Sequence, residues 1–168
     1  MTSIKLFVAA LAAGVVLAAN AQAPAIPASK DPEAIARVAR YANDWKFKAK
    51  RLSRDEVDAL LARPEAVVFV DLRRPDEQIR FGSFPVFLSI QNDRLEQELA
   101  WLPKDRGIVT VSNHSQRAGA AADLLAARGY RVIGATGAEE YEVAGGTAVA
   151  HLQAPAPKAA ASAPAPKS

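Results

Sequence analysis

Short, largely apolar runs, each followed by a helical pattern, constrain the fold of this chain most strongly. The runs are AVVFVD at 66–71, VFLSI at 86–90, GIVTVS at 107–112 and YRVIGA at 130–135. A strand without polar alternation is typical of a parallel sheet that is buried on both faces. Strands that alternate with helices of about ten residues indicate such a sheet. We therefore predict a single α/β domain with a central, mainly parallel β-sheet flanked by helices.

The helical patterns begin with an element that precedes the first strand. DPEAIARVARYANDW, at 31–45, has apolar residues at helical spacing behind Asp31 and Pro32, which suit a helix cap and first turn. We predict an extra N-terminal helix within 31–50 and a main domain over 51–150. Ser53 and Glu56 form a capping box for the next helix. Further helices are predicted over 73–82, 94–102, 116–129 and 138–145.

The ends of the predicted strands indicate where a functional site lies. In open α/β sheets ligands bind outside the carboxyl ends of the strands. The loops after Asp71, Val111 and Ala135 are the three that qualify.

The terminal segments differ in composition from this core. Residues 1–21 have one lysine, an apolar run from Leu6 to Ala19 and then small residues, the pattern of a secretory signal, with cleavage expected after Ala21 or Ala23. The run is shorter than the roughly 20 residues of a membrane span, so no stable span is expected. We predict a periplasmic or secreted protein, with a linker at 22–30 and a disordered Ala/Pro/Lys tail at 151–168.

Composition excludes several classes of function. The chain has no cysteine and two histidines, so neither a disulfide nor a metal site is expected, and no cofactor is indicated. Of 21 basic residues, Lys5, Lys158 and Lys167 lie in the predicted signal peptide and tail, and the other 18 equal the 18 acidic residues in number. The central part therefore lacks the basic bias of a nucleic-acid partner.

Two stretches carry a resemblance to a known family. In VVFVDLRRPDEQIRFGSFPVFLSI a strand ends in Asp-x-Arg and is followed by Pro-x-Glu and Gly-x-x-Pro. ELAWLPKDRGIVTVSNHSQRAGAAADLLAARGYRVIGATG supplies a strand, a loop, a helix and a further strand. In order and spacing these motifs resemble the rhodanese-like sulfurtransferase domain, over roughly residues 52–146.

The resemblance also shows what this chain lacks. Active members carry Cys-x-x-x-x-Arg in the loop, and the cysteine accepts sulfur as a persulfide. Counting back from Arg117 places Ser112 at the position of that cysteine. A serine oxygen forms no persulfide, and a helix N-terminus that ionises a thiol does not ionise a hydroxyl. The resemblance therefore implies a rhodanese-like domain without sulfurtransferase chemistry.

Anion binding is the chemistry that the loop retains. We expect backbone N–H groups of Asn113 to Arg117 to point into its hollow, next to the partial positive charge of the following helix. The candidate ligands of a small oxyanion, or of an acidic group on a partner protein, are Ser112, Asn113, His114, Ser115, Gln116 and Arg117. In the alternative interpretation Arg117 only braces the loop, by pairing with Asp71 or with loop carbonyls.

Asp71 and Arg73 are the candidate supporting residues. The resemblance implies that the aspartate holds the loop and that a nearby arginine faces the ligand. The alternative is a helix-start aspartate paired with a surface arginine. The rest of RRPDEQIR has the pattern of a solvated charged face, and of Phe81, Phe84 and Phe87 one or two are expected in the core.

Two other functions stay open at this stage. One is a serine-dependent hydrolase or transferase that uses Ser112 with His114, although side chains so close on a tight loop usually diverge and no third residue orients the imidazole. A solvent-exposed loop histidine is the simpler interpretation of His114.

The second open function is that of a structural module that interacts through its tail and extra helix. Tyr41, Trp45 and Phe47 are then either packing anchors of that helix or a partner surface. The oligomeric state is not predicted.

Overall fold

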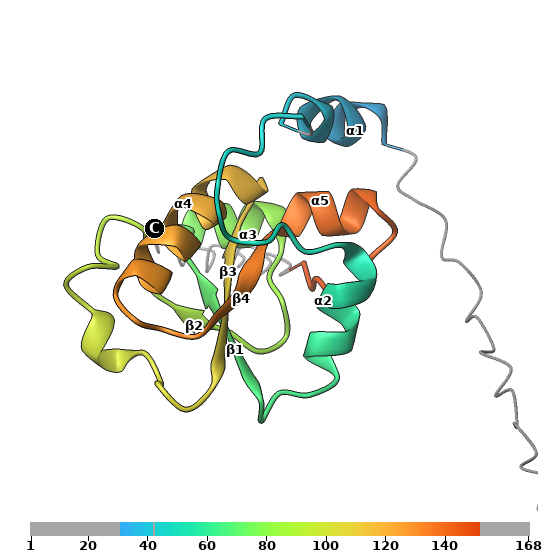
Figure 1. Cartoon of the computed structure of the whole chain (residues 1–168). Coiled ribbons are helices and arrows are strands. Elements are labelled where there is room, and N and C mark those ends of the chain that lie inside the picture. Colours follow the sequence, from blue (N-terminus) through green and yellow to red (C-terminus); the bar gives the residue numbers. More distant parts are fainter. Residues whose placement is uncertain (1–30, 42, 152–168) are drawn as a thin grey trace, which may run out of the picture.

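A computed structural model of the chain describes residues 31–41 and 43–151 (Figure 1). The predicted signal peptide, the linker and all but the first residue of the predicted tail lie outside the described residues. Among those that are described, no helix is long and apolar enough to cross a membrane.

The predicted parallel sheet is confirmed. Its strands are β1 (Val67–Asp71), β2 (Leu88–Ser89), β3 (Gly107–Ser112) and β4 (Val132–Gly137). They are arranged in the order β2-β1-β3-β4, and every pair of neighbours is parallel. Because β3 lies between β1 and β4, the loops that follow these three strands meet at one edge of the sheet.

Most of the predicted helices are also present. They are α1 (Pro32–Ala39), α2 (Arg54–Leu61), α3 (Pro75–Phe81), α4 (Ser115–Ala127) and α5 (Ala138–Val143). Asp31 caps α1 by accepting a hydrogen bond from the Glu33 amide, and Ser53 and Glu56 form the predicted capping box of α2. Gly129, at φ +81°, follows α4 in the left-handed conformation that glycine adopts most readily.

The helix predicted over 94–102 is wrong. This segment forms a series of tight turns and one 3₁₀ turn, η1 (Leu99–Trp101). Leu95 and Leu102 are both buried, and the Leu99 carbonyl accepts a hydrogen bond from the Tyr130 hydroxyl at 2.7 Å. These tertiary contacts hold the segment in turns, against the helical propensity of its side chains.

Two hydrophobic clusters cover the opposite faces of the sheet. Because successive side chains of a strand alternate between faces, Phe69 and Val70 belong to different clusters. On one face the strands pack against α2 and α5, with Val57 and Tyr141 in the cluster. On the other face they pack against α4 and the turn segment. The predicted α/β layering is therefore present, with helices on both faces of the sheet.

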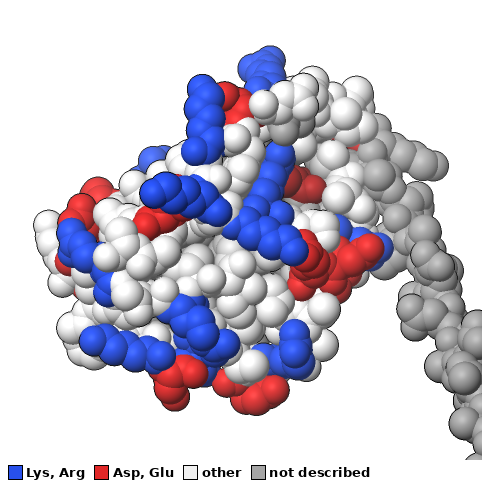
Figure 2. Space-filling model, viewed as in Figure 1, with Lys and Arg blue, Asp and Glu red and all other residues white. Residues whose placement is uncertain are grey.

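Helix α1 lies outside these two layers. In Figure 1 it lies beyond the carboxyl edge of the sheet and near α5, the helix that it contacts most. On the face drawn in Figure 2, basic and acidic side chains are interspersed over the domain. Helix α1, which precedes the domain in sequence, thus lies over the carboxyl edge of the sheet.

Candidate functional site

The three predicted site loops come together at the carboxyl edge of the sheet. Asp71 ends β1, Ser112 ends β3 and Gly137 ends β4. Asp71 pairs in register with Val111, and Ser112 pairs with Gly137. Strand β3 thus ends where its predicted run ends and β4 ends two residues beyond its predicted run, but the same loops follow them.

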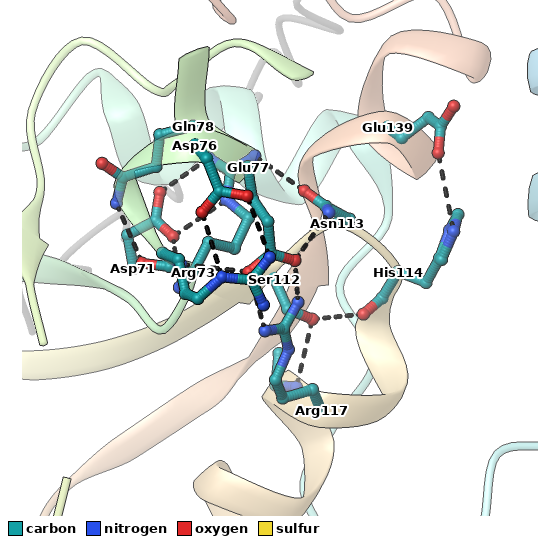
Figure 3. Close-up of polar contacts among 12 residues, drawn as sticks. Asp71, Arg73, Asp76, Glu77, Gln78, Ser112, Asn113, His114, Arg117 and Glu139 are labelled. Atoms are coloured by element: carbon teal, nitrogen blue, oxygen red, sulfur yellow. Dashed lines mark hydrogen bonds and ion pairs between the residues drawn. The ribbon is translucent and has the colours of Figure 1, made fainter. Parts of the chain in front are cut away.

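Ser112, at the nucleophile position, is fully buried. Its hydroxyl donates to the carbonyl oxygen of His114 and accepts from the Ala118 amide at 3.2 Å (Figure 3). The hydroxyl therefore joins the strand end to the first turn of α4. Its hydrogen bond to residue 114 goes to the backbone and not to the imidazole, so the geometry provides no Ser–His pair for nucleophilic catalysis.

Asp71 and Arg73 form a buried ion pair that reaches the loop. Arg73 Nε and Nη2 donate to the two carboxylate oxygens of Asp71, at 2.9 and 2.7 Å. Arg73 Nη1 donates to Asn113 Oδ1 at 3.0 Å. The interpretation of a surface arginine is wrong, because Arg73 is completely buried and Asp71 almost so. The pair holds the loop through Asn113, as the resemblance implied for the aspartate.

Arg117 pairs with Glu77, a residue that the sequence placed on a solvated face. Nη1 and Nη2 of Arg117 donate to the two carboxylate oxygens of Glu77, at 3.1 and 2.6 Å (Figure 3). Glu77 Oε1 also accepts from Asn113 Nδ2 at 3.1 Å. The Glu77 side chain is only 13% exposed, and its hydrogen bonds with Arg117 lower the pKa of its carboxyl.

A second internal carboxylate occupies the N-terminus of α4. Glu140 Oε1 accepts from both the amide and the hydroxyl of Ser115, each at 3.0 Å. Its other oxygen pairs with Arg51 at 2.9 Å. An anion at a helix N-terminus is stabilised by the helix dipole and the free amides. The protein thus supplies its own anion where an external one was expected.

Gly137 permits the close approach of β4 to the loop. A Cβ atom at this position would lie 2.6 Å from the Asn113 carbonyl oxygen and 2.9 Å from the Ser115 amide nitrogen. Its φ of −109° is open to any residue. Glycine is required by space and not by backbone conformation.

His114 is shielded from solvent, contrary to the prediction of an exposed histidine. Its side chain is 21% exposed and its ring stacks on Tyr41 with centroids 4.4 Å apart. Glu139 Oε2 lies 3.6 Å from His114 Nε2. Burial is the main cause that lowers the pKa of His114, against the opposing effect of the nearby carboxylates of Glu139 and Glu140.

The segment around α1 covers the loop. Gln116 Nε2 donates to the backbone carbonyls of Tyr41 and Asp44, at 3.3 and 3.0 Å. Arg37 binds Glu139 through Nη2 at 2.6 Å. Trp45 and Phe47 pack edge to face, against the position of Gly119 in α4. The predicted packing anchors thus fix the extra helix to the loop and to α4.

A cavity of about 210 Å³ lies beside Arg117. It is lined by Leu72, Arg74, Gln91, Asn92, Asp93 and Arg117. The Arg117 side chain is 33% exposed, whereas Ser112 has no exposed surface. Of the two residues that the family motif marks, Arg117 is the one that solvent reaches.

The aromatic residues before β2 divide as expected. Phe84 is buried in the core, between Phe69 and Tyr141. Phe87 is 37% exposed, and Phe81 lines a different cavity next to α1.

Sequence reasoning missed the three carboxylates that complete the site. Glu77 stood in a charged run, and Glu139 and Glu140 stood in the closing helix without an assigned role. A usable signal was available for the last two, because they directly follow a strand whose carboxyl end lies at the site edge. Among residues 31–41 and 43–151, no cluster of histidine and carboxylate side chains is arranged to hold a metal ion.

Comparison with solved structures identifies the fold. A rhodanese-like domain protein from Staphylococcus aureus superposes with a TM-score of 0.51 and 21% identity, over 62% of this chain and 99% of that one. A protein of unknown function from Rhodopseudomonas palustris, a possible tyrosine phosphatase, gives 0.52 and 22%, over 73% and 98%. The chain has the rhodanese-like fold.

The resemblance of the sequence to rhodanese-like domains is thereby confirmed at the level of the fold. A thiosulfate sulfurtransferase from Pseudomonas aeruginosa matches at a TM-score of 0.52 and 25% identity, over 71% of this chain but only 22% of that enzyme. No family model matches the sequence, and no curated protein matches it at a significant level. The chain has no cysteine, so the catalytic residue of a rhodanese is absent from this fold.

Proposed function

We propose that this rhodanese-like chain is a non-catalytic binding protein that takes an oxyanion, or an acidic side chain of a partner protein, at Arg117. The observation that carries the proposal is the pairing of Arg117 with the Glu77 carboxylate beside a cavity. A guanidinium held for two parallel hydrogen bonds is suited to carboxylate, sulfate and phosphate groups. Glu77 is a carboxylate already bound in this way, which supports the proposal.

Binding then takes place by exchange. An incoming anion replaces Glu77 on Arg117, and Glu77 keeps the Asn113 amide as a partner at 3.1 Å. Arg74 lines the same cavity and is a further cation at its rim. In the free protein Arg74 pairs with Asp76 at 2.9 Å. In the free protein Glu77 satisfies the charge of Arg117. An incoming anion must therefore bind Arg117 more favourably than Glu77 does, which favours ligands of matching geometry.

Sulfate is a simple probe of this exchange. Because Glu77→Gln removes the competing charge, we expect its sulfate affinity to be about tenfold higher than that of the wild type. Arg117→Ala should lose the rise in melting temperature that sulfate causes. Arg94→Ala is the matched control, since Arg94 pairs with Glu98 at 3.5 Å on the surface. Sulfate stabilisation that survives Arg117→Ala overturns the proposal.

We also propose that the protein acts after export, in the periplasm or outside the cell. The support is the lysine, apolar and small-residue pattern of residues 1–23, together with a chain free of cysteine. Mass spectrometry of the protein from the exported fraction should show an N-terminus at Gln22 or Pro24. Protein that keeps Met1 and remains in the cytoplasm contradicts export without affecting the binding proposal.

A further inference from the structure

A second cavity, of about 370 Å³, lies between α1, α3 and α5 and is separate from the cavity beside Arg117. Its volume falls within the range of roughly 300–1,000 Å³ that is common for small-ligand sites. Figure 1 shows α1 and α5 close together at the edge where it lies. The residues with ionisable side chains along it are Asp31, Arg37, Arg80, Glu139, Glu142 and His151.

Both signs of charge line this cavity. Arg37 pairs with Glu139, and His151 pairs with Glu142 at 2.7 Å. Asp31, the cap of α1, adds a third carboxylate. Arg80 has no carboxylate at ion-pair distance among the residues that the structure describes, and its guanidinium carbon lies 5.0 Å from the centroid of the Phe81 ring. The cavity therefore offers one cation that is not committed to an acidic partner.

Glu142 supplies the opposite requirement. Its side chain is 29% exposed, and its Oε1 pairs with His151, which leaves Oε2 to accept a hydrogen bond from a ligand. Glu139 is not available in this way, because Arg37 binds its Oε1 and its Oε2 is buried 3.6 Å from His114 Nε2. The cavity thus lacks an anion next to Arg80 and a hydrogen-bond donor next to Glu142.

We propose that this cavity binds a zwitterion of the α-amino acid class with an apolar side chain. The ligand carboxylate pairs with Arg80, and the ammonium group is held by Glu142. The side chain packs on Phe81 and Val143, which supply the apolar part of the lining. A simple anion would meet three carboxylates and a simple cation two guanidinium groups, so a ligand with one charge is disfavoured.

Titration calorimetry of the full chain with L-leucine tests this assignment. We expect saturable binding at one site, with a dissociation constant of about 1 mM or below. Leucine without its amino group, 4-methylpentanoate, and leucine without its carboxylate, 3-methylbutylamine, should each bind at least about tenfold more weakly. Equal binding of either single-charge analogue overturns the zwitterion assignment, and no saturable binding of leucine overturns the site.

Variants locate the binding. Arg80→Gln and Glu142→Gln should each lower leucine affinity by about tenfold, whereas Arg80→Lys keeps most of it because the charge is retained. Arg94→Gln, on the turn segment, is the matched control and should have no effect. Arg117→Ala should leave leucine binding intact, which separates this site from the proposed anion site. Unchanged affinity in both Arg80→Gln and Glu142→Gln places the leucine elsewhere and overturns the proposal.

Discussion

Arg73 and Asp71 form a two-pronged ion pair inside the protein, with Nε–Oδ1 at 2.9 Å and Nη2–Oδ2 at 2.7 Å. Both side chains are almost completely buried, at 0% and 1% exposed. Arg73 uses its remaining terminal nitrogen on Asn113, at 3.0 Å. The conformation of the loop after β3 thus depends on a charge pair at the end of β1.

Removal of one partner of this pair should be costly. In Asp71→Ala the Arg73 guanidinium remains buried without a counter-charge, so we expect a loss of about 3–5 kcal/mol in the free energy of unfolding. Denaturant titration measures this loss. The double variant Asp71→Ala, Arg73→Met leaves no buried charge and should be more stable than Asp71→Ala alone. A loss below about 1 kcal/mol in Asp71→Ala would contradict an essential role for the pair.

Replacement of Ser112 by cysteine should not restore sulfur transfer. A thiol at this position would be buried, and burial raises the pKa of a thiol. Glu140 already occupies the first amide of α4, so the helix N-terminus is partly neutralised. We therefore expect no transfer from thiosulfate to cyanide by Ser112→Cys, and slow alkylation by iodoacetamide at neutral pH. Rapid turnover by this variant would mean that the loop opens to solvent and holds a thiolate.

Gly119 should tolerate no larger side chain, because the segment before α2 packs directly on α4. A Cβ atom here would lie 2.3 Å from Phe47 Cδ2 and 2.7 Å from Trp45 Cη2. We expect Gly119→Ala to lower the free energy of unfolding by about 1–3 kcal/mol, because both rings must move. Ala120→Ser, at the exposed neighbouring position, is the control and should change it by less than about 0.5 kcal/mol. Similar stabilities of the two variants would show that Trp45 and Phe47 move aside at little cost in free energy.

The sequence predicted the sheet, the positions of its carboxyl ends and most helices, because these depend on local patterns. Apolar runs define β1 and β3, and caps at Asp31 and Ser53 define the starts of α1 and α2. The helix over 94–102 was wrong because Leu95 and Leu102 are held by the core and not by neighbours on a helix. Propensity carries no information about such long-range anchors.

The sequence predicted the loop after β3, but not the carboxylates of other elements that bind its residues. Glu77 and Glu140 lie 40 and 25 positions from the loop residues that they bind. In the sequence both belong to charged stretches that fit a solvated helix surface equally well. Whether a carboxylate faces solvent or binds the loop is decided by how α3 and α5 pack, which the spacing of residues does not determine. The expected exposure of His114 failed for the same reason, since Tyr41, which stacks on it, follows α1 and is far from the loop in sequence.

The shielding of His114 predicts a pH-dependent stability. Burial lowers its pKa, despite Glu139 and Glu140, and the nearby cations Arg37 and Arg117 act in the same direction as burial. The folded state therefore binds this proton less well than the unfolded state, so stability is fully present above pH 6.5, the ordinary value, and is lost as the pH falls below it. One such group contributes at most about 1.4 kcal/mol per pH unit.

His114→Phe keeps the stacking on Tyr41 without a titrating ring, so its unfolding free energy should fall less between pH 7 and pH 5. Denaturant titrations across this range make the comparison, and they avoid the lower pH at which the Glu77 carboxyl titrates. Parallel pH profiles of the two proteins would show that His114 is protonated equally well in the folded and unfolded chains.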